Sequence, residues 1–483
     1  MAPASQPIYL VAQLKRGVQL DGRIPPFGIM CVGEALRRAG RRVRLFHLDG
    51  DDGEKLFLKA VREDRPLWAG FSNCVSTTIR HDLALSRALH AQGVKIVWGG
   101  VFATALTDTV LREGSVDYVV RGDGERPAVA LTEAILNNAP PAGIPGVAWR
   151  DGEEIVSTPP APQEQDLDRY PMALDLVDWN DYIFREPAAA MVSASISLSR
   201  GCPFGCAFCT NSMDPGRRLW RGYSLDYIKE MVTFLKTRHG VGAVYLQDDN
   251  PFGKLKEGMK QVESLGLKWI SAAHLQYATP DFLDWARQCG CLNLSFGIES
   301  GSDRILGKMN KRIDRATIRE RMRLVGDKKI PSWAMWMAYV PGETIADRRA
   351  TFSLMDELYH VNPIVQSHLS VYQAYPGTPF YEESKKLGLR EPQSLDEWAD
   401  YTGIIAPLMG ARLRKVKRMT RDLRALYYYG SAQKQLHPAI RKILKRRVQG
   451  ATFSGPLEET LHYARLARDA AADLKKKIIR GTK

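Results

Sequence analysis

Long apolar runs are missing from this 483-residue sequence. No stretch approaches the roughly 18 uninterrupted apolar residues that a membrane-spanning helix needs, and the opening MAPASQPIYLVAQLKRG lacks the basic region and apolar core of a secretion signal. Seven cysteines are too few for a disulfide framework in a chain of this size. A composition of 45% hydrophobic and 25% charged residues excludes the disordered and fibrous classes. We therefore expect a cytoplasmic protein of two to four domains with no membrane partner.

Excess positive charge is concentrated in one part of the chain. The formal net charge is +14, and residues 411–447 hold 13 Lys or Arg against the single acid Asp422. Such a segment favours solvated surface helices or an acidic partner. A nucleic-acid partner is less favoured, although Tyr427, Tyr428 and Tyr429 could stack on bases, because the charge is local and no RNA-binding module accompanies it.

Short apolar runs alternate with helical patterns near the N-terminus. The runs predict buried parallel strands at residues 8–14, 43–48, 67–72, 94–100 and 117–122. Strict alternation with helices predicts a doubly wound, Rossmann-like α/β domain over residues 1–136. Ligands of such sheets bind beyond the carboxyl ends of the strands, where this sequence places PPFG at 25–28, Ser72, Gly99, Gly100 and the GDGE turn that begins at Gly122.

The later part of the chain has a different organisation. Prolines accumulate in residues 137–192, which predicts a connecting segment with little regular structure. Further strands are predicted at 193–198, 243–246, 269–273, 292–298, 333–339 and 364–371, with helix-sized spacers between them. Six β/α units suit a partial (β/α)6 barrel over residues 193–390, and residues 391–483 are predicted to form a basic helical region.

Three cysteines form the CxxxCxxC pattern of Cys202, Cys206 and Cys209. Thiolates at this spacing on a short Gly-containing loop suit an iron-sulfur cluster with one open iron, or zinc if a fourth ligand is supplied. No histidine or second CxxC pair lies nearby in the sequence, which disfavours zinc. Three buried structural cysteines are the remaining alternative.

The cysteine pattern resembles that of the radical SAM family, and Phe208 before the third cysteine fits the family pattern too. The resemblance implies a partial barrel whose first loop binds a 4Fe-4S cluster, with the open iron chelating S-adenosylmethionine (SAM). It also implies reductive cleavage of SAM to a 5'-deoxyadenosyl radical, which abstracts hydrogen from an unactivated carbon. Family members need an acidic reductase such as flavodoxin or ferredoxin, which the basic segment could attract.

Weaker motifs downstream match the same family. The resemblance implies that Asp248 and Asp249 bind the SAM amino group or line the substrate pocket. It likewise implies SAM contacts for Glu299 and Ser300 of a GIES turn and for Pro341 and Gly342 of a PGET turn. Cys291 begins the strand that leads to Glu299 and could donate a hydrogen or an electron, although a small core residue is the simpler interpretation.

The α/β domain resembles the cobalamin-binding domain of one radical SAM subfamily. The resemblance implies that Ser72, Gly99, Gly100 and Gly122 contact cobalamin, since glycines at strand ends allow close approach of a large ligand. There is no DxHxxG motif to ligate cobalt, and Phe102 follows the GG pair where family members often carry histidine. An inherited domain that no longer binds cobalamin is therefore the alternative.

The leading hypothesis is an enzyme that activates a C-H bond of a small natural-product intermediate for cobalamin-dependent C-methylation. One alternative is cobalamin-independent dehydration of a diol in a cationic aminosugar, which Asp248, Asp249, Glu299 or Glu343 would help to hold. A second alternative, from another class, is a tRNA-modifying or RNA-binding protein.

Overall fold

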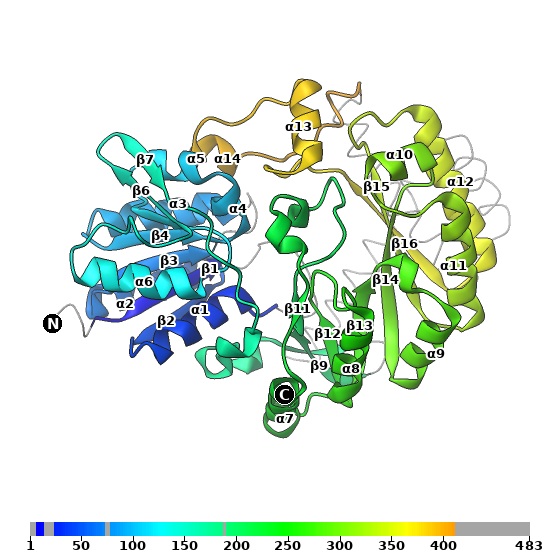
Figure 1. Cartoon of the computed structure of the whole chain (residues 1–483), viewed down its shortest axis with the longest axis horizontal. Coiled ribbons are helices and arrows are strands. Elements are labelled where there is room, and N and C mark those ends of the chain that lie inside the picture. Colours follow the sequence, from blue (N-terminus) through cyan, green and yellow to red (C-terminus); the bar gives the residue numbers. More distant parts are fainter. Residues whose placement is uncertain (1–5, 14–23, 73–77, 187–189, 411–483) are drawn as a thin grey trace, which may run out of the picture. The chain divides into compact units, whose positions relative to one another are not determined.

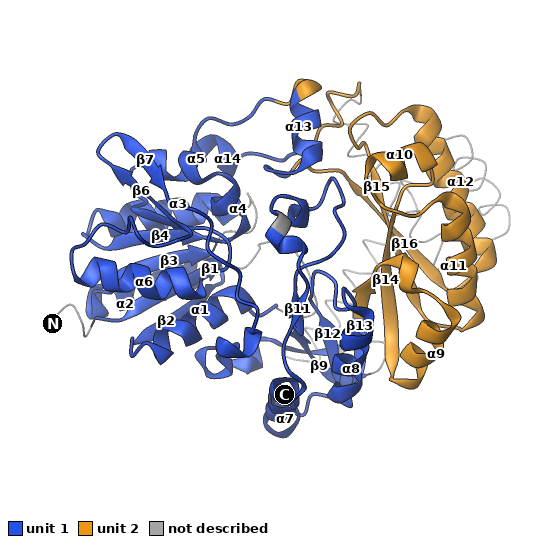
Figure 2. Ribbon diagram, in the orientation of Figure 1, with its two compact units in different colours: residues 1–270, 375–385, 390–403 blue, residues 271–374, 386–389, 404–483 orange. Residues whose placement is uncertain are grey.

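The computed structural model describes residues 6–13, 24–72, 78–186 and 190–410. The chain divides into two compact units (Figure 2). Unit 1 consists of residues 1–270, 375–385 and 390–403, and unit 2 consists of residues 271–374, 386–389 and 404–483. Across the described ranges, no helix is long and apolar enough to cross a membrane.

A seven-stranded sheet occupies the N-terminal part of unit 1 (Figure 1). Its strand order is β2-β1-β3-β4-β5-β6-β7, with the first five strands parallel and the last two antiparallel. The strands are β1 (Ile8–Gln13), β2 (Val43–Leu48), β3 (Trp68–Ser72), β4 (Lys95–Gly99), β5 (Tyr118–Val120), β6 (Val147–Asp151) and β7 (Glu154–Ser157). The five predicted strands are thus confirmed, since a continuous apolar run is typical of a parallel strand that is covered on both faces.

Helices cover both faces of this sheet. On one face, α1 (Phe27–Arg38) and α6 (Glu125–Leu136) share a core cluster with β1. On the other face, Tyr9 of β1 contacts Phe57 of α2 (Gly50–Asp64). The remaining helices are α3 (Ile79–His90), α4 (Gly100–Ala105) and α5 (Thr107–Arg112). The predicted doubly wound arrangement is therefore present.

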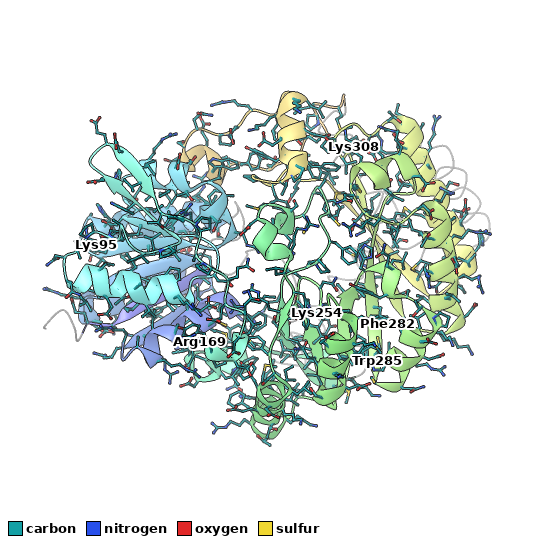
Figure 3. All side chains as sticks on the ribbon, in the orientation of Figure 1. Lys95, Arg169, Lys254, Phe282, Trp285 and Lys308 are labelled. Carbon is teal, nitrogen blue, oxygen red and sulfur yellow. The ribbon has the colours of Figure 1, made fainter. Side chains whose placement is uncertain are left out.

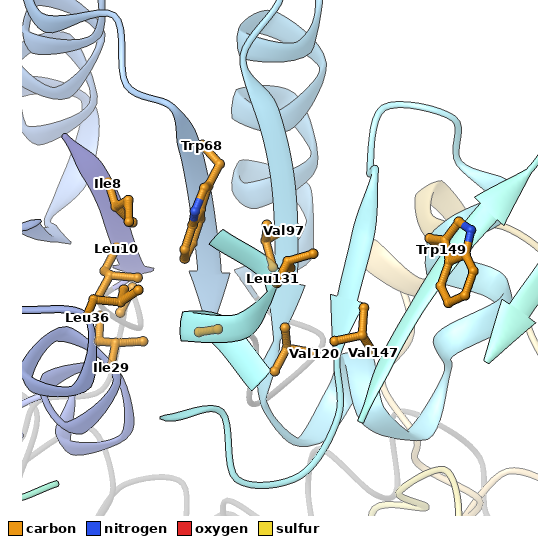
Figure 4. Close-up of a cluster of buried hydrophobic side chains, with 12 residues drawn as sticks. Ile8, Leu10, Ile29, Leu36, Trp68, Val97, Val120, Leu131, Val147 and Trp149 are labelled. Atoms are coloured by element: carbon orange, nitrogen blue, oxygen red, sulfur yellow. The ribbon is translucent and has the colours of Figure 1, made fainter. Parts of the chain in front are cut away.

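Side chains from successive strands build the core on the α1 and α6 face (Figure 4). Leu10, Trp68, Val97 and Val120 come from β1, β3, β4 and β5 and are nearly inaccessible to solvent. The indole of Trp68 donates a 3.1 Å hydrogen bond to Oγ1 of Thr132, so its one polar atom is satisfied inside the core. This packing holds the strand ends, and the turns that follow them, in place.

Residues 137–192 contain more regular structure than predicted. Here β6 pairs with β5, and β7 pairs with β6, so the sheet of the first domain extends to Ser157 rather than ending near residue 136. Short turns of 3-10 helix follow: η3 (Leu167–Arg169), η4 (Leu174–Leu176) and η5 (Trp179–Asp181). The prolines mislead because β6 and β7 are antiparallel strands at the sheet edge, and the prolines lie outside them.

Six β/α units follow, as predicted. In unit 1, β8 (Ile183–Glu186) pairs antiparallel with β9 (Met191–Ile196), which pairs in parallel with β12 (Ala243–Leu246). The helices after β9 and β12 are α7 (Leu225–His239) and α8 (Leu255–Leu265). The Ser224 side chain caps the start of α7, and Gly240, in the left-handed conformation, ends it. Strand β13 (Lys268–Ala273) crosses from unit 1 into unit 2.

Unit 2 contains the remaining strands of the series. Within it, β14, β15 and β16 pair in parallel. Its elements are η8 (Leu275–Tyr277), α9 (Pro280–Gln288), β14 (Cys291–Glu299), α10 (Asp303–Lys308), α11 (Arg315–Asp327), β15 (Ser332–Ala338), α12 (Ile345–Val361) and β16 (Val365–Val371). Figure 3 labels Phe282 and Trp285 on α9, whose rings lie 5.4 Å apart between centroids. The predicted strand positions agree to within two residues.

The predicted C-terminal region begins on unit 1. Helix α13 (Pro379–Lys386) precedes α14 (Leu395–Ala399). Trp398 of α14 packs edge-on against Phe102 at 5.6 Å between ring centroids, and Arg87 of α3 binds Asp396 at 2.7 Å. The prediction of basic surface helices concerns residues that lie outside the described part of the chain.

Candidate active site

The cysteine loop is held on a short hairpin stem. Strands β10 (Ser199–Arg200) and β11 (Arg221–Gly222) pair antiparallel, with Arg200 opposite Arg221. Between them lie the three cysteines and two turns of 3-10 helix, η6 (Thr210–Ser212) and η7 (Pro215–Arg218). Gly201 has a φ of +87°, and a side chain there would collide with the backbone of Leu219. This glycine is therefore required by the loop geometry.

The three thiols lie on this loop at different depths. Cys206 is buried, and Cys202 and Cys209 are half-buried. Burial raises the pKa of the Cys202 thiol, and the neighbouring Cys209 adds to the rise. Among the described residues, no three Cys, His, Asp or Glu side chains converge on one metal ion. An iron-sulfur cluster binds each thiolate to a different iron, so its ligands need not converge on one point.

Sequence reasoning missed Asn250, which follows the two acidic residues of the QDDN turn. Its Nδ2 lies 3.7 Å from Sγ of Cys202, and its backbone oxygen accepts a 3.0 Å hydrogen bond from the indole of Trp220. Hydrogen bonds to ligand sulfurs tune the potential of iron-sulfur clusters. The signal was present in the sequence, because Asn250 stands at the same strand end as the two acids.

Asp248 and Asp249 organise the base of the cysteine loop. Oδ1 of Asp248 accepts hydrogen bonds from the Leu198 amide at 3.0 Å and the Ser199 hydroxyl at 2.6 Å. Oδ2 of Asp248 is buried with no hydrogen-bond partner in the described structure. Burial raises the pKa of this carboxyl from 3.8 to about 7. Asp249 accepts a 3.3 Å hydrogen bond from the Gly201 amide.

A cavity of about 720 Å³ lies within unit 1, beside the base of this loop. The N-terminal domain contributes Phe27, Gly28, Gly100 and the turn 121–125 to its wall, and the later segment contributes Gly201, Arg217, Asp248 and Asp249. A Cβ atom added at Gly28 or Gly122 would meet no atom within 4 Å, so the cavity wall is open at both positions. Ser72 and Gly99, also predicted to contact a ligand, are not among the residues that line it.

The cavity wall carries polar atoms that lack partners in the described structure. They are Nε of Arg121, Oε1 of Gln163, Nε of Arg221 and Oδ2 of Asp248. Both donors and acceptors are present, which suits a large ligand that carries amide groups, as the corrin ring does. The residues present therefore fit a corrinoid in this cavity.

The two bulky residues around the GG pair do not obstruct the cavity. Trp98 is fully buried, and its indole donates a 2.9 Å hydrogen bond to Ser86 of α3. Phe102 is 6% exposed and packs on Trp398. Neither residue lines the cavity. Phe102, which stands where family members often carry histidine, therefore serves to pack α14 against the N-terminal domain.

The GIES motif lies within unit 2. Glu299 is buried with a φ of +67°, and its Oε1 lies 3.2 Å from Nζ of the buried Lys311. The Ser300 hydroxyl is fully buried and lies 3.2 Å from Oγ1 of Thr351. Sequence reasoning missed Lys311, which lies 12 residues beyond Glu299 in no recognisable motif. The proposed SAM contacts of Glu299 and Ser300 stay predictions.

The PGET motif and Cys291 also lie in unit 2. Gly342 has a φ of +76°, and its carbonyl accepts a 2.8 Å hydrogen bond from Arg304. Burial raises the pKa of Glu343 to about 7, although Arg348 lies 3.0 Å away. Burial also raises the pKa of the Cys291 thiol. These contacts neither support nor contradict the roles predicted for Pro341, Gly342 and Cys291, and the role of Phe208 also stays a prediction.

The described chain combines a doubly wound N-terminal domain with six β/α units, and the CxxxCxxC loop follows β9, the first strand of that series. This combination defines a radical SAM enzyme with a corrinoid-type N-terminal domain. Comparison with known proteins agrees. The radical SAM superfamily profile matches residues 196–355, and the B12 binding domain profile matches residues 16–132.

Two relatives and one solved structure extend the comparison. An anaerobic magnesium-protoporphyrin IX monomethyl ester cyclase of Synechocystis sp. is 30% identical over 352 residues, which are 70% of this chain and 69% of the cyclase. An uncharacterized methyltransferase of Pyrococcus horikoshii is 26% identical over 343 residues, 70% of this chain and 72% of that protein. The radical SAM methyltransferase TsrM of Kitasatospora setae, solved with cobalamin and a 4Fe-4S cluster, has a TM-score of 0.65 at 17% identity and covers 80% of this chain and 76% of its own.

The chain therefore belongs to the radical SAM superfamily, among the members that carry a B12-binding domain. It is an enzyme of that family, whose cofactors are a 4Fe-4S cluster, SAM and cobalamin.

Proposed function

We propose that this protein is a cobalamin-dependent radical SAM methyltransferase that methylates a carbon atom of a small molecule. The observation that carries the proposal is the cavity in unit 1. Strand-end residues of the B12-binding domain and the base of the cysteine loop line it together. A corrinoid in that cavity would lie directly beside the loop that bears the cluster ligands, which methyl transfer to a radical carbon requires.

Each part of the chain has a defined task in this proposal. Cys202, Cys206 and Cys209 ligate the cluster, and Asn250 donates to the sulfur of Cys202. When bound, the cluster supplies the electron that cleaves SAM to the 5'-deoxyadenosyl radical, and the corrinoid supplies the methyl group. The wall is open to the ligand at Gly28 and Gly122. The buried Asp248 carboxyl can donate a proton to, or accept a hydrogen bond from, a polar ligand group near neutral pH.

Dehydration of a cationic aminosugar is less well supported. The four carboxylates that would hold the cation are already engaged within the chain. Asp248 and Asp249 bond the stem and first residue of the cysteine loop, Glu299 pairs with Lys311, and Glu343 pairs with Arg348. A cationic substrate would have to displace the internal partners of Asp249 and Glu299. Oδ2 of Asp248 and Oε1 of Glu343, which have no hydrogen-bond partner in the described structure, are the carboxylate oxygens it could reach without such displacement.

The cyclase among the relatives favours a second candidate. In that case the radical chemistry would close a ring on the substrate without methyl transfer. An acidic reductase such as flavodoxin or ferredoxin remains the proposed electron donor in both cases. The basic segment expected to attract it lies outside the described residues.

Analysis of SAM-derived products separates the two candidates without knowledge of the substrate. Protein reconstituted anaerobically with iron, sulfide and cobalamin is incubated with SAM and a chemical reductant. We expect both 5'-deoxyadenosine and S-adenosylhomocysteine, since methylation uses SAM as radical source and as methyl donor. Omission of cobalamin should remove only S-adenosylhomocysteine. 5'-Deoxyadenosine without any S-adenosylhomocysteine in the complete mixture would overturn methyl transfer and favour the cyclase type.

A further inference from the structure

The GDGE turn makes contacts that its glycines did not suggest. Asp123 and Glu125 lie between the end of β5 and the first turn of α6, at the edge of the cavity. Nη2 of Arg200 donates a 2.6 Å hydrogen bond to Oε1 of Glu125, and Nη1 of Arg221 donates one of 2.6 Å to Oδ2 of Asp123. Arg200 also lies 3.6 Å from Asp123. Glu125 therefore bonds strand β10 of the cysteine-loop stem, and Asp123 bonds strand β11.

The four side chains form a neutral cluster of two acids and two arginines with little solvent exposure. Exposed fractions are 4% for Glu125, 5% for Arg221, 22% for Arg200 and 23% for Asp123. Burial alone would raise the pKa of Asp123, but Arg200 and Arg221 lower it below its usual value. Removing the charge of either acid leaves an arginine of the cluster without its full compensation, which destabilises the structure around that arginine.

The stem needs support from outside itself. Each of its strands has only two residues, and a two-stranded hairpin is at best marginally stable in water. Arg200 lies two residues before Cys202, and Arg221 pairs with Arg200 on the opposite strand of the stem. One rigid support is Asp248, just after the end of β12, which bonds Ser199, and another is the turn after β5 of the seven-stranded sheet, which carries Asp123 and Glu125.

We propose that Asp123 and Glu125 are positioning residues, which hold the cysteine loop through Arg200 and Arg221 and so make its geometry depend on the B12-binding domain. The proposal rests on the proposed function only in treating the three cysteines as cluster ligands. Because the same turn lines the cavity, a ligand bound there would contact the residues that hold the stem.

Two variants test the proposal against a matched control. Glu125→Gln and Asp123→Asn keep the side-chain shape and remove the charge. The control is Asp117→Asn, at the residue just before β5. This substitution breaks the 2.9 Å ion pair between Asp117 and Lys95, and Lys95 is labelled in Figure 3. Asp117 and Asp123 thus flank the same strand, and only Asp123 contacts the stem.

The first measurement is hydrogen exchange on the full chain without cofactors. We expect amides of residues 199–222 to exchange at least about tenfold faster in both variants, with β1 unchanged, and no change in the control. The second is the midpoint potential and EPR signal of the reconstituted cluster, which should shift in the variants at unchanged iron content. Glu125→Asp, which keeps the charge on a shorter side chain, should show a smaller change in the same direction, and it replaces Glu125→Gln if that variant does not fold.

Unchanged exchange in residues 199–222, or an equal change in Asp117→Asn, would overturn the proposal. A general loss of protection that includes β1 would also overturn it, since that result indicates global destabilisation rather than positioning. The exchange measurement needs no cofactor. A wild-type protein that fails to bind iron would therefore refute the cluster assignment, whereas the exchange rates alone decide whether Asp123 and Glu125 support the stem.

Discussion

Replacing Asp248 by asparagine should change how stability depends on pH. The carboxyl is 8% exposed, and its Oδ2 has no partner in the described structure. Asparagine can still accept the hydrogen bonds from the Leu198 amide and the Ser199 hydroxyl, and it carries no charge. The substitution therefore removes mainly the cost of holding a buried carboxylate.

The magnitude follows from the pKa difference between the folded and unfolded states. The pKa is about 7 when folded and near 3.8 when unfolded. A raised acid pKa means that the folded state binds more protons, so stability is fully present below the unfolded pKa and is lost as pH rises toward the folded pKa. At about 1.4 kcal/mol per pKa unit, roughly 2 kcal/mol is lost between about pH 5.5 and about pH 8. In Asp248→Asn this loss should disappear.

Urea unfolding of wild type and Asp248→Asn at the two pH values measures the effect. The variant should gain about 2 kcal/mol relative to wild type on going from about pH 5.5 to about pH 8, because other titrating groups cancel in the difference. The reasoning is refuted if the stability difference between the two proteins is the same at both pH values. Such a result would mean that water or a neighbouring group neutralises the carboxylate.

Further substitutions test other parts of the site. Gly28→Trp should fill the cavity and abolish corrinoid absorbance, whereas Gly28→Ala should retain it, and equal binding by both would exclude this cavity as the corrinoid site. Lys311→Met should lower the free energy of unfolding by about 3 kcal/mol because it leaves Glu299 buried without its partner. The double variant Lys311→Met/Glu299→Gln should recover most of that loss in the same urea assay, and no recovery would argue against the ion pair. Cys206→Ala should reduce bound iron from about four per chain to background and stop 5'-deoxyadenosine formation, while Cys291→Ala leaves the iron unchanged. Iron retained by Cys206→Ala would contradict the cluster assignment.

Local sequence determined the elements of this protein and their order. The run at residues 8–14 becomes β1 because a continuous apolar segment is stable as a strand covered on both faces. Gly40 and Gly93 follow the ends of α1 and α3 with positive φ angles, which glycine adopts without a steric cost. The cysteine spacing is local too, so the class of cofactor could be inferred before any fold was known.

Tertiary structure decided what the side chains of the motifs contact. Nothing near Glu299 in the sequence indicates that its partner is Lys311, and nothing in GDGE indicates that its two acids bind arginines about 75 and 98 residues away. The directions of Trp98 and Phe102 depend on helices that the chain adds before and long after them. A motif therefore predicts a turn and its backbone, but the partners of its side chains depend on chain folding over long distances.

The electrostatic character of the site was likewise set by folding. In the sequence, Asp248 and Asp249 are two adjacent carboxylates, and nothing indicates which of them would bind a ligand. In the structure, burial raises the pKa of Asp248, and Asp249 bonds the Gly201 amide. Desolvation depends on every atom packed around a group, so the chemical identity of a site residue is given by the sequence and its charge state by the fold.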